Sequence, residues 1–219
     1  MRKLLERINK ASSGKKRLYY SLLSVSIVIM IAIVILALYV GRVYYIKTYG
    51  IRLIPTQDYA VPELSYYRQN DPEWQDEEIG ASQRKMGSTG CLVSCVATAI
   101  SQLDSPITPM EFNDKLTQFN GFQGADLIWY KINEAFPNID YRYRRIFNNR
   151  MIESDLKKGL LPIVNVKYHK TGITHWVIIT GARDSEFIIC DPLGDGQSTS
   201  LLSDHGKVYS YRVIERDGN

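Results

Sequence analysis

The stretch from Gly87 to Ile100, GSTGCLVSCVATAI, contains the residue with the clearest chemical potential in this chain. Small and hydroxyl residues lead into an apolar segment that predicts a helix, and Cys91 stands where that helix begins. The positive end of a helix dipole stabilises a thiolate, which is the nucleophilic form of cysteine. Cys91 is therefore a candidate nucleophile if the fold brings a base to it. The alternative is an inert, buried cysteine at the start of a core helix.

The chain has three histidines that could supply this base: His169, His175 and His205. His175 opens the apolar stretch THWVIITG, so packing would fix its ring at a strand end while a nitrogen faces a cleft. His169 lies near a predicted hairpin turn and His205 in a polar loop, and we predict that both are solvated. His175 is therefore the candidate general base. The alternative is a core histidine whose ring nitrogens bond to backbone groups.

Two further side chains complete a possible acyl-transfer site. Asp191 ends the apolar strand in IICDPLGDG and could orient a histidine on the neighbouring strand, although an Asp-Pro pair also caps turns. The side-chain amide of Gln69 and the backbone N–H of Cys91 are candidate donors to an oxyanion. The other two cysteines, Cys95 and Cys190, are assigned to packing.

The order and surroundings of these four residues resemble one family. Gln69 precedes Asn-Asp-Pro-x-Trp, Gly-Cys opens a helix at Cys91, His-Trp-Val opens a strand at His175, and Asp-Pro-x-Gly begins at Asp191. From residue 61 to 214 the chain resembles stand-alone relatives of the bacteriocin-processing (double-glycine leader) cysteine peptidases, which have a papain-like fold. The resemblance implies a nucleophile, a general base and acid, an orienting carboxylate and an oxyanion-hole amide. These roles would fall to Cys91, His175, Asp191 and Gln69, respectively.

The elements that must position these residues are helical first and stranded later. Hydrophobic periodicity and capping signals predict helices at 91–103, from 109 to just before Gly121, at 125–135 and at 151–158. The second of these starts at Thr108-Pro109-Met110-Glu111, where a Thr cap precedes a proline and a glutamate stands three residues after the cap. Alternation and β-branched runs predict strands at 63–69, 139–146, 160–168, 174–181, 186–191 and 207–214. This order predicts an α+β fold: a helical part that contains the nucleophile helix, followed by an antiparallel sheet.

The N-terminal region predicts a membrane anchor. Residues 18–41 contain no charged side chain, and these 24 residues exceed the roughly 20 that a helix needs to cross a bilayer. Seven basic residues and one acidic residue in 1–17 predict a cytoplasmic N-terminus and an extracytoplasmic remainder. We therefore predict a basic cytoplasmic segment at 1–17, a transmembrane signal-anchor helix at 18–41, a linker at 42–62 and a catalytic domain at 63–219. A cleavable signal peptide is the alternative, but the apolar run is long for one.

Composition restricts the partners of the predicted domain. From residue 43 onward, 22 acidic residues outnumber 19 basic ones, which argues against a nucleic-acid-binding face. The sequence requires no cofactor and has no zinc-type cysteine spacing. The expected partners are a peptide or protein substrate and the lipid bilayer. Two other functions stay open: a cell-wall peptide amidase on the same fold, and a non-catalytic surface module that binds peptides.

Overall fold

The computed structural model describes the backbone of residues 2–62 and 64–218, and side chains from Leu18 onward within these ranges. The chain divides into two compact units, Met1–Tyr45 and Ile46–Asn219. We describe each unit by itself.

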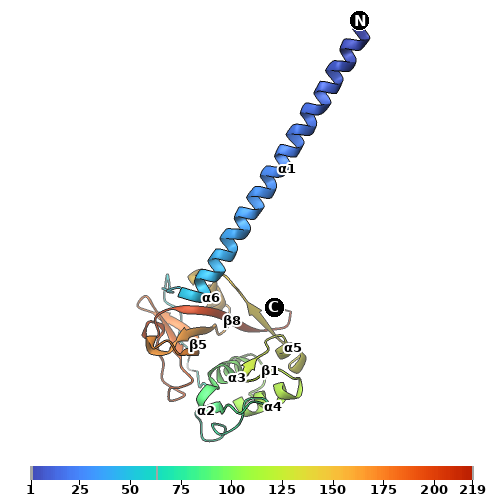
Figure 1. Cartoon of the computed structure of the whole chain (residues 1–219). Helices are drawn as coiled ribbons and strands as arrows, with labels where there is room; N and C mark the ends of the chain where they lie inside the picture. Colours follow the sequence, from blue (N-terminus) through green and yellow to red (C-terminus); the bar gives the residue numbers. More distant parts are fainter. Residues whose placement is uncertain (1, 63, 219) are drawn as a thin grey trace. The chain divides into compact units, whose positions relative to one another are not determined.

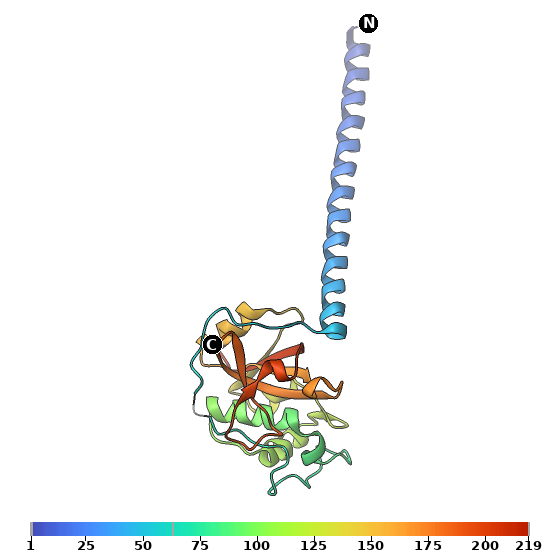
Figure 2. The ribbon, with the colours of Figure 1, turned by 90° about the vertical axis from the view of Figure 1, so that its left-hand side faces the viewer.

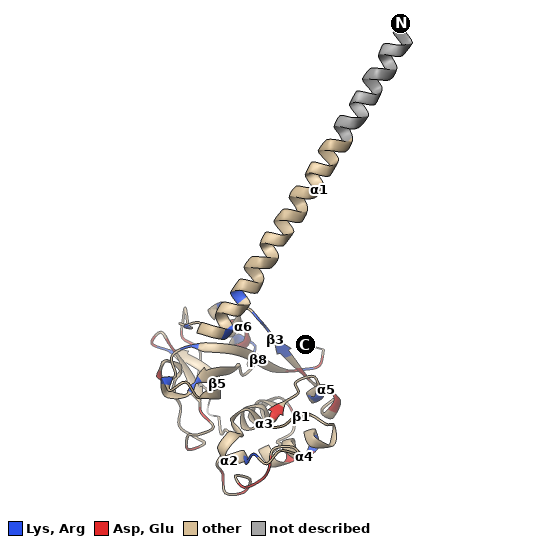
Figure 3. Ribbon diagram, viewed as in Figure 1, with Lys and Arg blue, Asp and Glu red and all other residues tan. Residues whose placement is uncertain are grey.

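Helix α1 runs from Arg2 to Tyr49. The N-terminal unit contains this helix as far as Tyr45, and the last turn belongs to the second unit. The helix segment Leu18–Tyr49 reaches a mean hydropathy of 3.0, and its most apolar window is not buried against any other part of the protein. The uncharged stretch 18–41 is the uninterrupted tan part of α1 in Figure 3. At 1.5 Å per residue this stretch is about 36 Å long, which exceeds the roughly 30 Å of a bilayer hydrocarbon core. The predicted apolar helix is therefore long enough to span a membrane.

The second unit is built on a six-stranded antiparallel sheet with the order β3-β8-β4-β5-β6-β7. Its strands are β3 (Ile139–Tyr143), β4 (Ile163–Lys167), β5 (Thr174–Arg183), β6 (Glu186–Cys190), β7 (Ser200–Leu201) and β8 (Val208–Arg216). The helices are α2 (Met86–Thr89), α3 (Cys91–Leu103), α4 (Pro109–Gln118), α5 (Lys131–Ala135) and α6 (Asn149–Lys157). Helices α2 to α5 precede the six-stranded sheet, and α6 lies between β3 and β4. The helices and the antiparallel sheet are thus largely separate in the chain, and the predicted α+β class is confirmed.

Successive residues of a strand point to opposite faces of the sheet. Both faces are covered by other elements. On β5, Ile178 packs into the core that α3, α4 and α5 share, whereas Val177 and Ile179 pack into a second core with residues of α6. Figure 1 and Figure 2 show the sheet between α3 on one side and α6 on the other. Helix α3 is the central helix of the first core: nine of its 13 residues are buried, and it contacts β5 and β8.

The structure corrects two of the predicted elements. Only Lys131–Ala135 of the predicted helix 125–135 is helical, and a small hairpin replaces its beginning. This hairpin pairs β1 (Phe122–Gln123) with β2 (Asp126–Leu127) through a turn in which Gly124 has a φ of +62°, a value that favours glycine. The described part of the predicted strand 63–69 is irregular, since its backbone bonds to loops and side chains rather than to a strand.

The structure describes the whole segment 42–62, which the sequence predicts to be a linker. Helix α1 continues to Tyr49, and Ile46 in its last turn is buried in the second core. Ile51 then pairs with Val208, and Tyr59 pairs with Ala182. Residues 51–62 therefore lie against the domain as an extended strap.

Helix α4 gives a direct test of how local sequence contributes to stability. The Thr108 hydroxyl accepts the backbone N–H of Glu111, and the Glu111 carboxylate accepts the backbone N–H of Thr108, as the sequence predicted. We expect Thr108→Ala to lower the free energy of unfolding of the detergent-solubilised chain by about 1 kcal/mol, because it removes this cap. Denaturant titration measures the change.

The matched control lies on the same helix. Thr117→Ala replaces an exposed threonine in the last turn of α4, whose hydroxyl donates to the carbonyl oxygen of Asn113 one turn earlier. Such a bond to the preceding turn does not cap the helix, and alanine has the higher helix propensity. This control should leave stability unchanged or raise it slightly. An equal loss of stability in both variants would contradict the capping role of Thr108.

Candidate active site

Cys91 is the first residue of α3, and a tight turn from α2 places it there. Gly90 joins the two helices, and a Cβ at this position would lie 2.4 Å from Sδ and 2.5 Å from the carbonyl oxygen of Met86. Only glycine therefore fits this turn without a shift of α2. The first N–H groups of α3 have no carbonyl partner within the helix, so the positive end of the helix lies at Cys91.

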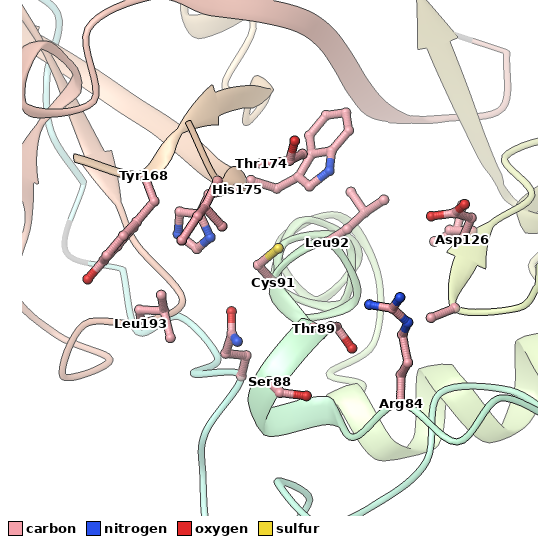
Figure 4. Close-up of a pocket in the computed structure, with 15 residues that line it drawn as sticks. Arg84, Ser88, Thr89, Cys91, Leu92, Asp126, Tyr168, Thr174, His175 and Leu193 are labelled. Atoms are coloured by element: carbon pink, nitrogen blue, oxygen red, sulfur yellow. The ribbon is translucent and has the colours of Figure 1, made fainter. Parts of the chain in front are cut away.

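Cys91 opens onto a cleft of about 550 Å³ that Gln69 and His175 also line. Figure 4 shows Cys91 beside His175, with Tyr168 and Leu193 on one side and Arg84 and Asp126 on the other. The side chain of Cys91 is 9% exposed, so it is covered by neighbours yet reachable from the cleft.

His175 and Asp191 form a short, buried hydrogen bond. The β5–β6 register places Ile178 opposite Cys190, so Asp191 leaves the sheet close to where β5 begins. Nε2 of His175 lies 2.6 Å from Oδ1 of Asp191, and the ring is 3% exposed. The backbone N–H of Leu193 donates to the same Oδ1 at 2.8 Å. This bond leaves Nδ1 of His175 as the nitrogen available to Cys91.

The surroundings of this pair favour opposite charges on its two members. Burial by itself lowers the pKa of His175, but the Asp191 hydrogen bond and the interaction with Cys91 outweigh burial and raise this pKa to about 9. Burial by itself raises the pKa of Asp191, but its contacts with His175 and His205 hold that pKa well below the usual carboxyl range. At neutral pH the pair is therefore an imidazolium and a carboxylate.

Gln69 is held in the cleft wall by two hydrogen bonds. Its Nε2 donates to the carbonyl oxygen of Gly87 at 2.9 Å. Its backbone N–H donates to the carbonyl oxygen of Pro192, also at 2.9 Å. The side chain is 3% exposed, and its Oε1 has no hydrogen-bond partner among the described residues. Nε2 carries two amide hydrogens, and the bond to Gly87 uses one of them.

All four residues proposed from the sequence therefore gather at one place. Gln69, Cys91 and His175 line the cleft, and Asp191 stands directly behind His175.

The structure also contains a neighbour of this site that the sequence did not predict. His205 was expected to be solvated, but it is 2% exposed, and its Nε2 lies 3.4 Å from Oδ2 of Asp191. It is buried because the short helix η2 (Leu202–Asp204) packs against β6. The polar residues around it in the sequence carry no signal of this non-local contact. His169, in contrast, is exposed as predicted.

Tyr168 is a second residue that the sequence did not single out. Its ring meets that of His175 edge to face, with the ring centres 5.2 Å apart. It lines the cleft beside the reactive pair and helps to hold the imidazole plane.

The two remaining cysteines are buried and lie outside the cleft lining. Burial raises the pKa of Cys95 well above the usual thiol range, and burial raises that of Cys190 to about 12. Both thiols stay protonated at neutral pH, which is consistent with the packing role predicted for them. In the described part of the chain, no group of three His, Cys, Asp or Glu residues is arranged to hold a metal ion.

Comparison with solved structures shows a similarity of fold. No protein-family model matches the chain, and no curated protein matches it. The chain is similar to a crystal structure of a Bacillus anthracis protein described provisionally as a C39-like peptidase. The two are 10% identical, the match covers 72% of this chain and 97% of that chain, and the TM-score is 0.49. We assign no residue role from this likeness.

The charge state of His175 can be measured without a substrate. In the full chain in detergent, NMR of labelled histidine should give His175 a pKa of about 9, well above its ordinary value near 6.5. We expect Asp191→Asn to lower the pKa of His175, because the neutral amide no longer stabilises the imidazolium. A His175 pKa that is ordinary in the wild-type chain and unchanged by Asp191→Asn would contradict this assignment.

The same shift gives the expected sign for stability. The folded-state pKa of His175 is raised, so its contribution to stability is fully present below pH 6.5 and is lost as the pH rises through 9. The difference in unfolding free energy between the wild-type chain and Asp191→Asn should shrink across this interval.

Proposed function

We propose that this protein is a membrane-anchored, extracytoplasmic thiol hydrolase that cleaves a peptide or related amide bond through Cys91, His175 and Asp191. The observation that carries the proposal is the buried His175–Asp191 pair, 2.6 Å apart, beside a cysteine that opens a helix in the same cleft. A thiolate–imidazolium pair of this kind is the activated nucleophile of cysteine hydrolases.

The reaction begins when Sγ of Cys91 attacks the carbonyl carbon of the substrate. The C–S bond forms, and the carbonyl electron pair moves to the oxygen. The other Nε2 hydrogen of Gln69 and the backbone N–H of Cys91 donate to this oxyanion. The His175 imidazolium then transfers its Nδ1 proton to the leaving nitrogen, and the C–N bond breaks to give an amine and a thioester.

Water completes the cycle. Neutral His175 takes a proton from the water, and the oxygen attacks the thioester carbon. The C–S bond breaks, the acid product leaves, and the Cys91 thiolate and His175 imidazolium are restored. Asp191 keeps its negative charge throughout and stabilises the imidazolium at both stages.

The size and the lining of the cleft favour a peptide-like substrate. Its volume lies within the range of small-molecule and peptide-segment sites, about 300–1,000 Å³. Apolar side chains of Leu92, Leu127 and Trp176 line it, and Arg84 and Asp126 add charged groups of both signs at one side (Figure 4). Such a lining suits an extended chain that has apolar side chains and polar backbone groups.

The two other functions that the sequence left open fit the site unequally. A module that only binds peptides does not need a short His–carboxylate bond behind a cysteine. A cell-wall peptide amidase would use the same residues on a different substrate. Fluorogenic peptides and purified wall peptides are therefore both included in the assay below.

Substitution of the nucleophile tests the proposal. We expect Cys91→Ala in the full, detergent-solubilised chain to abolish hydrolysis of the susceptible substrate and labelling by an electrophilic thiol probe. In the native wild-type chain, mass spectrometry should find the probe on Cys91 and not on Cys95 or Cys190, which lie outside the cleft lining and stay protonated. Hydrolysis that persists in Cys91→Ala would refute the assignment.

Gln69 separates activation of the thiol from stabilisation of the oxyanion. Gln69→Ala should lower kcat by about 10²–10³-fold, the usual effect of removing one oxyanion donor. It should leave probe labelling of Cys91 intact, since alkylation of the thiol forms no oxyanion. Equal losses of labelling and turnover would indicate that Gln69 acts on the fold or on the thiol instead.

The anchor and its direction are part of the proposal. Helix α1 is apolar enough to span a membrane, and the basic residues of 1–17 lie on its N-terminal side. Basic flanks favour the cytoplasmic side, so the domain would be exported. The extended strap that follows α1 would then join an uncleaved anchor to the domain.

Protease protection tests this direction. In intact spheroplasts that express the chain with a tag at each end, added protease should remove the C-terminal tag and spare the N-terminal one. Detergent lysis is the control, and it should expose both tags. Loss of only the N-terminal tag would reverse the proposed orientation. A mature product that lacks the N-terminal tag before protease is added would show that α1 is a cleaved signal sequence.

A further inference from the structure

We propose that His205 is a positioning residue of the active site: its Nε2 holds the second oxygen of Asp191 and so keeps the first oxygen on His175. This inference rests on the proposed function, because it gives the His175–Asp191 pair a role in hydrolysis. Nothing in the local sequence of His205 assigns it such a role.

The first argument is the arrangement of donors around Asp191. Oδ1 already accepts from Nε2 of His175 and from the backbone N–H of Leu193, and Oδ2 lies 3.4 Å from Nε2 of His205. The distance to His205 exceeds the usual N–H···O range of about 2.7–3.2 Å, so this contact is weaker than the 2.6 Å bond to His175. Its effect is directional: a group on Oδ2 opposes rotation of the carboxylate away from His175.

The second argument is that the backbone fixes which nitrogen of His205 carries its proton. The backbone N–H of His169 donates to Nδ1 of His205 at 3.1 Å. Nδ1 is therefore the acceptor nitrogen, and in the neutral ring the hydrogen resides on Nε2, which faces Asp191. His205 thus offers a donor to the carboxylate without adding a charge.

The third argument is the backbone conformation that supplies this N–H. His169 has a φ of 40° and Lys170 a φ of 65°. Both values lie in the left-handed region, which residues other than glycine seldom adopt. Such strain persists only where the surroundings hold it. Here the strained turn directs a backbone donor at a buried ring, and it lies next to Tyr168 in the cleft wall.

The groups that face His205 come from three parts of the chain. Its ring centre lies 4.9 Å from that of His169, 5.7 Å from that of Tyr168 and 5.9 Å from that of His175, and Asp191 completes the cluster. At 2% exposure, a His205 that left Asp191 would be a buried polar group without its partner, which is unfavourable. The contact is therefore stable as well as directional.

Three variants in the full, detergent-solubilised chain test this role. His205→Ala should lower kcat about tenfold and leave KM unchanged, because one hydrogen bond to a charged group is lost while the cleft is intact. NMR of labelled histidine should also show the His175 pKa falling towards its ordinary value, since a rotated carboxylate supports the imidazolium less well. His205→Gln, whose amide nitrogen can occupy the place of Nε2, should restore both quantities to within about twofold and a few tenths of a pH unit.

The control for simple loosening of this region is Leu202→Ala. Leu202 lies in the same short helix and is buried in the second core, so its truncation destabilises η2 without removing a donor to Asp191. It should lower the unfolding free energy and leave the His175 pKa in place. An unchanged or raised His175 pKa in His205→Ala would overturn the proposal, as would an equal fall in Leu202→Ala. The NMR measurement needs no turnover, so the role of His205 can be judged even if the chain hydrolyses none of the substrates tried.

Discussion

A carboxylate that is largely removed from water is the constraint on which the rest of this site depends. The side chain of Asp191 is 13% exposed, and a charge at such a position must be matched by hydrogen bonds and an opposite charge. The matching groups come from β5 (His175), from the loop that follows Asp191 (Leu193) and from the turn after η2 (His205). The order of strands in this part of the sheet can thus be understood as the arrangement that brings these donors to one carboxylate.

The helical part solves a different problem, which is to bring a thiol to this pair. Helix α3 is buried on most of its surface and packs against β5 and β8, so its axis is fixed relative to the strand that carries His175. The Gly90 turn then sets Cys91 at the helix start, and the backbone bond between Gln69 and Pro192 ties Gln69 to the Asp191 loop. Each group is thus carried by an element that is packed against or bonded to the element of another, which is how a site becomes preorganised.

The sequence predicted those parts of the molecule whose causes are local. The Thr108 capping box and the start of α3 at Cys91 depend on residues a few positions apart, and both are found as predicted. The gathering of His175 and Asp191 was also predictable, because an antiparallel hairpin returns the end of one strand to the start of the other. The burial of His205 was not, since it follows from the packing of η2 on β6, and a polar loop has no periodicity that reports it. The β1–β2 hairpin was missed for a related reason: apolar residues spaced as on a helix also occur in a hairpin followed by a short helix.

That hairpin has a consequence for how the site can change over evolutionary time. Its two strands form a sheet of their own, separate from the six-stranded sheet, yet Ala125, Asp126 and Leu127 line the cleft next to the nucleophile. No atom lies within 4 Å of where a Cβ on Gly124 would be, so the tip has open space around it. Insertions or exchanges at this tip would remodel one wall of the cleft without disturbing the strands that carry His175 and Asp191. Under the proposed function, selectivity and reactivity would then be encoded in separable segments, so that such a chain could be retargeted to a new peptide while it keeps its chemistry.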